Sequence, residues 1–93
     1  MLSTKDKEAI QTLARQYKVS RVLLFGSNKD AGHKGNDIDL AVEGLPASRF
    51  FKFYGDLIFN LSQPVDLVDI SKPSRFSKMI AAEGITLYGN AAG

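Results

Sequence analysis

The segment from Asp37 to Glu43 alternates between large apolar side chains and acidic or small ones. Ile38, Leu40 and Val42 occupy the even positions, and Asp37 and Asp39 occupy the first two odd ones. Successive side chains of a β-strand point to opposite faces, so this pattern predicts a strand with a buried back and an acidic front. The fold must therefore cover one face of a sheet and leave part of the other face open.

Apolar periodicity and turn residues predict the other elements in the order α-β-β-α-β-α-β. A helix capped by Ser3 or Thr4 and ending near Tyr17 comes first. It is followed by a strand at 21–25, a polar loop at 28–36, the strand at 37–43, a helix at about 47–61, a strand at 65–70, a helix from Pro73 or Ser74 to Gly84, and a strand at 85–88.

The two later helices carry apolar stripes that should pack on the sheet. The second-helix stripe comprises Phe50, Phe53, Tyr54, Leu57, Ile58 and Leu61. In the last helix we expect Phe76, Met79 and Ile80 to face inward and Gly84 to end the helix in a left-handed conformation.

The length of 93 residues predicts a single domain spanning 1–93, with little room for a second substrate-binding lobe. The fold class is α/β, with a small mixed β-sheet and helices packed mainly on one face. A chain of this size buries little more than ~60% of its unfolded surface, so we expect the substrate to lie in an open cleft.

Composition indicates the expected cellular location of the chain and the kinds of ligand that it could bind. A hydrophobic content of 44% with 24% charged residues is typical of a soluble globular domain. No apolar run approaches the ~20 residues that span a membrane, and the first ten residues do not resemble a secretion signal. Because the chain has no cysteine, we expect a cytoplasmic protein without disulfides. A net charge of +2, scattered along the chain, argues against a nucleic-acid groove but permits phosphate-bearing ligands.

Three carboxylates are candidates for a metal site. Asp37 and Asp39, at i and i+2 of one strand, have Cα atoms about 6.6 Å apart and can reach the same hard cation. A bare Asp-x-Asp is also typical of a solvated strand face. Asp66 adds weight because it shares its face with Val68 and Ile70, which should face a core, and a carboxylate buried there must be paired, metal-bound or protonated. If the strand of Asp66 lies beside the strand of Asp37 and Asp39, Asp66 completes a cluster of three carboxylates. Asp69 is the competing acid, but it falls on the other strand face, where solvent or a helix cap could satisfy it.

Gly26 and Ser27 follow directly on the first strand and form a candidate phosphate site. A glycine at this point lets the backbone approach an anion, and the serine hydroxyl adds a donor. A lone Gly-Ser is common in turns. The order of strand, Gly-Ser, loop and Asp-x-Asp makes the combination more specific.

With these motifs the chain resembles the nucleotidyltransferase superfamily of the DNA polymerase β type. LLFGS at 23–27 and DIDLAV at 37–42 carry the resemblance, which is closest to the minimal nucleotidyltransferases, or MNT proteins. VDLVDI at 65–70 and EGITLYG at 83–89 extend it over nearly the whole chain.

The resemblance implies roles for individual residues. Gly26 and Ser27 would hold the triphosphate of ATP, with Asn28 and Lys29 beside them. The catalytic and metal-binding positions would be Asp37, Asp39 and Asp66, which hold two Mg²⁺ ions, with Asp66 also helping to activate the acceptor hydroxyl.

The phosphate loop departs from many relatives, which carry an arginine directly after Gly-Ser. Asn28 stands there instead, so Lys29 or Lys34 would have to substitute, and Asp30 adds a negative charge. His33, between Gly32 and Lys34, is expected at the surface rather than on a metal.

The function implied by the resemblance is transfer of a nucleoside monophosphate, AMP from ATP, to a hydroxyl acceptor. The acceptor would lie on a partner protein, a helical HEPN toxin for which this chain is the antitoxin. The alternative is a catalytically weak or inactive nucleotide-binding module that neutralises its partner by binding. Phe59 falls opposite the second-helix stripe and is either a lone exposed aromatic residue or part of a partner surface.

Overall fold

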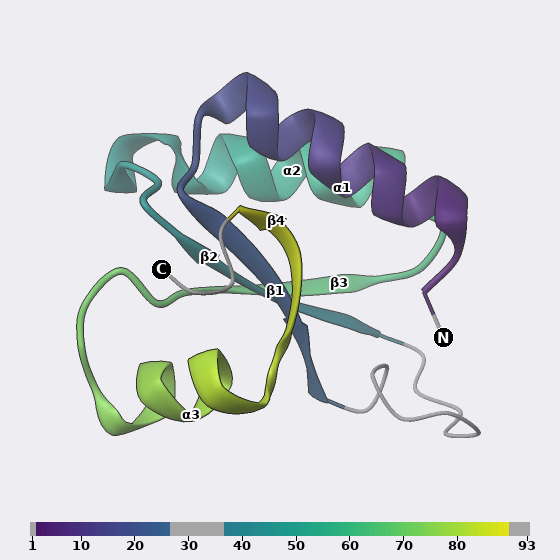
Figure 1. The fold of residues 1–93 in the computed structure, drawn as a ribbon. Helices are drawn as coiled ribbons and strands as arrows, with labels where there is room; N and C mark the ends of the chain where they lie inside the picture. The colour runs from purple at the N-terminus through teal and green to yellow at the C-terminus, as the bar shows by residue number, and fades with distance from the viewer. Residues whose placement is uncertain (1, 27–36, 90–93) are drawn as a thin grey trace.

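The computed structural model describes residues 2–26 and 37–89 of the chain. Their elements are α1 (Thr4–Tyr17), β1 (Arg21–Phe25), β2 (Ile38–Glu43), the short 3-10 helix η2 (Ala47–Arg49), α2 (Phe50–Asn60), β3 (Val65–Asp69), α3 (Arg75–Glu83) and β4 (Ile85–Gly89). This is the order expected from the sequence, with η2 added at the start of the second helix (Figure 1). No helix in these two stretches is long and apolar enough to cross a membrane.

The four strands form one mixed sheet in the order β3-β2-β1-β4. Strand β1 is antiparallel to both β2 and β4, whereas β2 and β3 run parallel. A parallel pair cannot be joined by a tight turn, so the chain returns across the sheet through α2. The mixed α/β architecture predicted from the sequence is confirmed.

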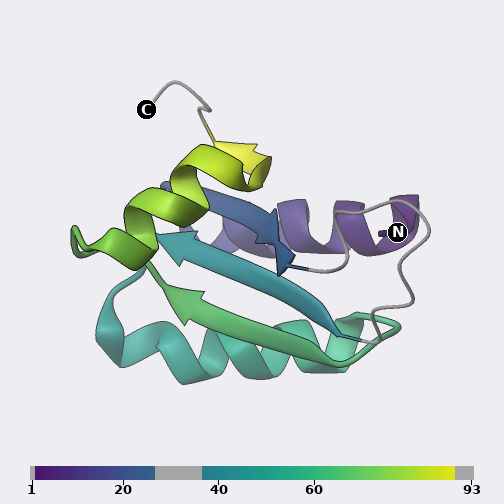
Figure 2. The same ribbon diagram turned by 90° about the horizontal axis from the view of Figure 1, so that it is seen from below.

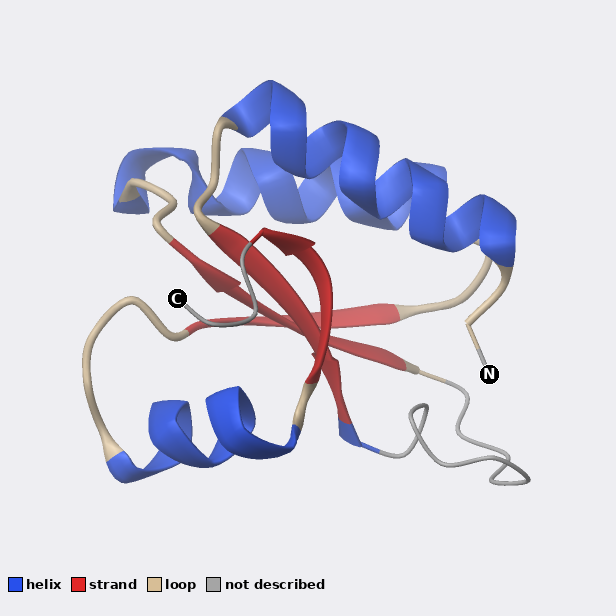
Figure 3. Ribbon diagram, in the orientation of Figure 1, coloured by secondary structure: helices blue, strands red, loops and turns tan. Residues whose placement is uncertain are grey.

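Two helices cover one face of the sheet and the third lies on the other (Figures 1 and 3). The larger core joins α1 and α2 to alternate residues of the strands, such as Val22, Leu24 and Leu40. The smaller core joins Ile80 of α3 to Leu23 and Ala41. The side chains of β1 and β2 are therefore divided between the two faces by the alternation seen in the sequence.

The first helix begins and ends on specific hydrogen bonds. Ser3 caps its N-terminus by accepting a hydrogen bond from the Asp6 backbone, and Lys18 ends it in a left-handed conformation (φ 57°). The Asp6 side chain is buried and accepts hydrogen bonds from the backbone N–H and the hydroxyl of Ser62. These bonds tie the start of α1 to the segment that leads from α2 into β3.

The expected packing of three large side chains is wrong. Ile58 in α2 is exposed, and Phe76 and Met79 in α3 are each 47% exposed. Phe76 and Met79 are exposed because α3 contacts the sheet chiefly through β1, so that Ile80 is the only large apolar side chain of α3 that is buried. The buried stripe of α2 is also narrower than the sequence pattern predicts, since it does not include Ile58.

The expected left-handed conformation of Gly84 is also wrong. Its φ of −75° and ψ of 162° are extended, because the chain passes directly from α3 into β4. A Cβ on Gly84 would lie 2.7 Å from the Ile80 carbonyl oxygen and 3.2 Å from that of Leu24. Glycine is needed here for close packing of backbones and not for a positive φ.

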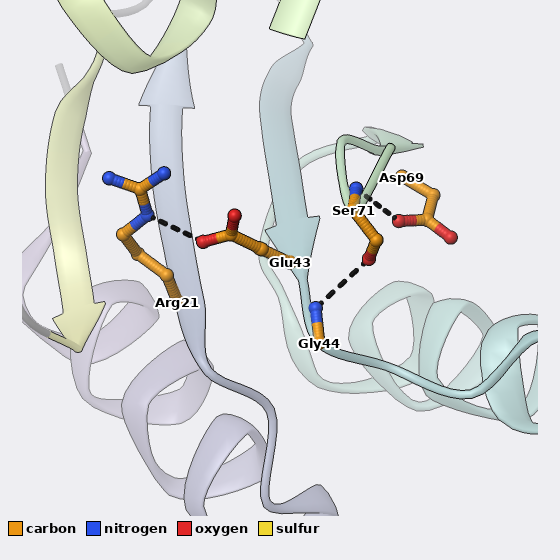
Figure 4. A network of polar contacts seen from close by, with 5 residues as sticks. All are labelled: Arg21, Glu43, Gly44, Asp69 and Ser71. Carbon is orange, nitrogen blue, oxygen red and sulfur yellow. Dashed lines mark hydrogen bonds and ion pairs between the residues drawn. The ribbon is translucent and has the colours of Figure 1, made fainter. Parts of the chain in front are cut away.

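Polar contacts hold the sheet together at the end where β1 begins and β2 ends (Figure 4). Arg21 and Glu43 form a 3.0 Å ion pair across these two strands. Ser71 accepts a hydrogen bond from the Gly44 backbone at 3.0 Å and donates its own N–H to Asp69 at 2.9 Å. Asp69 is thus engaged in a turn at the far end of β3 from Asp66.

Candidate functional site

The sheet brings together residues that are far apart in the chain, where β1 ends and β2 and β3 begin. Asp39 is the register partner of Asp66 on the parallel strand β3 and of Phe25 on the antiparallel strand β1. Register partners point to the same face of a sheet with Cβ atoms about 5 Å apart. Asp39 and Asp66 therefore share one face, with Phe25 on the other side of Asp39.

Figure 2 shows how the described helices cover this face of the sheet. Helix α3 lies across the half of this face toward the ends of β2 and β3, and no helix within residues 2–26 and 37–89 covers the beginnings of these strands. Helices α1 and α2 cover the opposite face. Asp39 and Asp66, near the beginnings of β2 and β3, thus lie on the half of this face that none of the described helices covers.

Gly26 lies directly against Asp39. It has a φ of +77°, and a Cβ at this position would come within 2.2 Å of Oδ2 of Asp39. Both observations require glycine, because an L side chain would be strained in this conformation and would displace the carboxylate. The glycine after the first strand is therefore adapted to its carboxylate neighbour.

The electrostatics of Asp39 reflect this crowding. Its partial burial raises the pKa of its carboxyl above the ordinary value of 3.8, and the negative charges of Asp66 and then Asp37 raise it further. A group in this position is stabilised in its ionised form by any cation placed among the three carboxylates. The local field therefore favours binding of a metal ion.

The burial expected for Asp66 is wrong, because its side chain is exposed. It lies near the start of β3, beyond the half of the face that α3 covers, whereas the neighbouring Val68 is partly buried. The position beside Asp39, which the sequence analysis made conditional on β3 lying next to β2, is found.

Within the described residues no three Asp, Glu, His or Cys side chains are arranged as a complete set of metal ligands. Asp37 is exposed and lies one residue before β2, and its charge acts on Asp39. The chemistry of the donor set nonetheless fits Mg²⁺, which takes carboxylate oxygens as ligands and keeps several waters. Ser27, Asn28, Lys29 and His33 lie outside the described residues.

Two aromatic residues at the site were missed by the sequence analysis. The rings of Phe25 and Phe76 meet edge to face with centroids 6.3 Å apart, and both rings remain partly exposed. The position of Phe25 could have been predicted from the alternation within β1, because Phe25 lies two residues after Leu23 and therefore points to the same face of the sheet. No sequence pattern indicates that Phe76 would reach it from α3.

Comparison with known proteins identifies the family. The chain matches the family model described as "Polymerase beta, Nucleotidyltransferase" over residues 7–92. It belongs to this nucleotidyltransferase family. A search of the curated proteins finds no match.

Several solved structures resemble this nucleotidyltransferase. A chain of a toxin–antitoxin crystal structure determined with AMP-PNP is 28% identical, with a TM-score of 0.74 over 92% of this chain and 75% of the other. A chain of the MntA–HepT toxin–antitoxin structure is 25% identical, with a TM-score of 0.72 over 97% and 75%. A chain from the tri-AMPylated Shewanella oneidensis HEPN toxin in complex with MNT antitoxin is 26% identical, with a TM-score of 0.69 over 94% and 72%. These neighbours support the minimal nucleotidyltransferase assignment.

Proposed function

We propose that this chain is a Mg²⁺-dependent nucleotidyltransferase that moves AMP from ATP to a hydroxyl group of a HEPN-type partner protein and so acts as an antitoxin. The observation that carries the proposal is the pairing of Asp39 with Asp66 in register, with Gly26 packed against Asp39. The resemblance to toxin–antitoxin structures, one with AMP-PNP and one with an AMPylated HEPN toxin, supports the nucleotide and the partner.

The chain's own residues have separate tasks in this reaction. Gly26 and Ser27 bind the triphosphate through backbone and hydroxyl donors, assisted by Asn28 and Lys29. Asp37, Asp39 and Asp66 hold the metal ions. The exposed Asp66 carboxylate accepts the proton of the acceptor hydroxyl.

The proposed transfer is a substitution at the α-phosphorus of ATP. The acceptor oxygen forms a bond to the α-phosphorus of ATP, the bond from that phosphorus to the oxygen bridging to the β-phosphate breaks, and pyrophosphate leaves. When bound, two Mg²⁺ ions stabilise the charge on the attacking and leaving oxygens. Because the carboxylates lie on the uncovered half of the sheet face, a protein acceptor can reach them directly and exclude water as it docks.

The decisive test is incubation with α-labelled ATP, Mg²⁺ and the product of the neighbouring gene. We expect label on the partner protein and release of pyrophosphate. A partner that binds tightly but never acquires label would favour the alternative, an inactive module that neutralises by binding. Label on a free small molecule would retain the transferase and exclude the protein acceptor.

Nucleotide binding should depend on the metal. The negative charge of the triphosphate cannot approach three carboxylates without cations between them, so ATP affinity should fall at least about 100-fold when Mg²⁺ is replaced by EDTA. Titration calorimetry with and without Mg²⁺ measures this. Equal affinity under both conditions would contradict the proposed site.

Phe76 is proposed to contact the adenine base, because its half-exposed ring lies at the edge of the site beside Phe25. Stacking on an aromatic ring contributes about 1–3 kcal/mol per base, so Phe76→Ala should weaken binding of Mg²⁺–ATP by roughly tenfold. Binding of Mg²⁺–tripolyphosphate, which has no base, should not change. Phe59→Ala, which removes an 88% exposed ring from the covered side of the sheet, is the matched control.

A further inference from the structure

Helix α2 presents an apolar stripe to solvent on the side away from the site. Phe51 and Phe59 are 82% and 88% exposed, and Ile58 lies between them at 58%. Gly55 occupies the middle of the same helix face. We call these four residues the α2 stripe.

The composition of this face is unusual for a solvent-exposed helix. All of α2 lies in the described part of the chain, and Lys52 is the one charged residue among its exposed positions. Soluble helices normally carry charged and polar side chains on the face away from the core. Contiguous exposed apolar side chains of this kind mark interaction surfaces.

Gly55 has no explanation within the single chain. It lies in the helix interior, where glycine is less favourable than alanine, and a Cβ at this position would meet nothing within 4 Å. Within residues 2–26 and 37–89, no close contact or positive φ requires glycine at this position. A glycine at an exposed helix centre is explained if another backbone approaches there.

The two phenylalanines of the stripe are placed symmetrically about Gly55, whereas the position equivalent to Ile58 on the other side is Lys52. Phe51 precedes Gly55 by four residues and Phe59 follows it by four, so both lie one helical turn away on the same face. If a second α2 crosses antiparallel with a two-fold axis at Gly55, Phe51 of each chain meets Phe59 of the other. A two-fold interface requires this self-complementarity, and a surface adapted to an unrelated partner does not.

We propose that α2 pairs with α2 of a second copy of this chain, with the two-fold axis at Gly55. The three large side chains expose on the order of 400 Å² per chain, and pairing them would bury about twice this area. This total of about 800 Å² lies below the 1,200–2,000 Å² of standard-size specific complexes and in the range of weak, transient ones. A dimer with a dissociation constant on the order of 10 µM is the expected result.

Phe59 lies on the opposite side of the sheet from the proposed nucleotidyltransferase site. The sequence permits a partner surface at Phe59, and α2, which carries Phe59, covers the sheet face opposite Asp39 and Asp66. A second copy on α2 therefore leaves both sites of the dimer open to acceptors. The dimer does not depend on nucleotidyl transfer, so either proposal can fail without the other.

Because the chain contains no cysteine, a single introduced thiol can report on the axis. Residues on a two-fold axis at a helix crossing approach within the 4.4–6.8 Å between Cα atoms that a disulfide needs. Gly55→Cys should therefore form a covalent dimer under mild oxidation at about 50 µM protein. Ala82→Cys, an exposed position on α3 across the sheet, is the matched control and should stay monomeric.

Sedimentation analysis of the unmodified chain and two variants completes the test. The wild-type protein should shift from monomer to dimer between roughly 1 and 200 µM, and Phe59→Glu should abolish the shift without lowering the melting temperature. Gly55→Leu should raise the melting temperature of the monomer at low concentration while weakening the dimer at least tenfold, because it fills the point of closest approach. A wild-type chain that stays monomeric at about 200 µM would overturn the proposal, as would a dimer insensitive to Phe59→Glu. Loss of partner-protein binding alone in the Phe59→Glu variant would assign the face to that partner and also overturn it.

Discussion

Asp39→Asn should abolish nucleotide transfer and yet make the protein more stable in EDTA. The loss of transfer should be on the order of 10³-fold, because the substitution removes a charged ligand from the centre of the carboxylate group. The gain in stability follows from the raised pKa of Asp39, which shows that its ionised form is disfavoured by burial, Asp66 and Asp37. We expect the melting temperature in EDTA to rise.

The pH dependence of this gain is a second measure of the same effect. The carboxyl of Asp39 has its pKa raised in the folded chain above 3.8, so the folded state retains the proton at a pH where the unfolded state has lost it. The contribution of Asp39 to stability therefore falls as pH rises from about 3.8, and the loss is complete above the raised pKa. Thermal unfolding of wild type and Asp39→Asn in EDTA should diverge over that interval, with the variant more stable at neutral pH.

Asp69→Asn provides the control on the same sheet. Asp69 lies at the far end of β3 and accepts a hydrogen bond from Ser71, which an asparagine side chain can also accept. Transfer should be unchanged in this variant. If Asp39→Asn instead lowered the melting temperature markedly, Asp39 would be a structural residue with a stabilising partner, and the metal site would be refuted.

Gly26→Ala should have the second largest effect, through displacement of the Asp39 carboxylate. The added Cβ would lie 2.2 Å from Oδ2 of Asp39, so the carboxylate or the backbone must move. A misplacement of about 1 Å at a reacting site costs roughly 100-fold in rate, and we expect at least this loss of transfer. The positive φ of +77° should also cost about 1–2 kcal/mol in folding free energy.

Gly44→Ala is a control that separates the loss of transfer caused by a displaced carboxylate from the loss of folding free energy caused by a strained backbone. Gly44 also has a positive φ (+83°), and its Cβ would lie 2.2 Å from Oγ of Ser20, but it follows β2 at the opposite end of the sheet. This variant should lose a similar amount of stability and keep its transfer rate under conditions where it is folded. Equal loss of transfer in the two variants would mean that Gly26 acts through general stability alone.

Much of the architecture could be predicted because local patterns carry it. The alternation around Leu40 and the helical spacing around Ile10 correctly assign residues to the larger core, and Ser3 caps α1 as expected. The position of Asp66 beside Asp39 could only be stated conditionally, since strand order and register depend on how α2 crosses the sheet and not on any local pattern.

The wrong expectations for Phe76 and Asp66 have a common physical origin in incomplete covering of the second sheet face. A helix of α3's length shields only half of that face, so Phe76 and Asp66 are exposed although periodicity places them toward it. Hydrophobic patterns report which side a residue is on, but they do not report whether a neighbour extends far enough to bury it.

The parallel pairing of β2 with β3 has a consequence for folding. Neighbouring parallel strands must be joined by a crossover, which here contains α2 and returns the chain to the starting end of the sheet. The pairing that places Asp39 beside Asp66 is therefore coupled to the packing of α2 on the sheet. Any ligand that binds between the two carboxylates would act on the opposite side of the molecule, slowing the opening of α2 and the exchange of its amide protons with solvent.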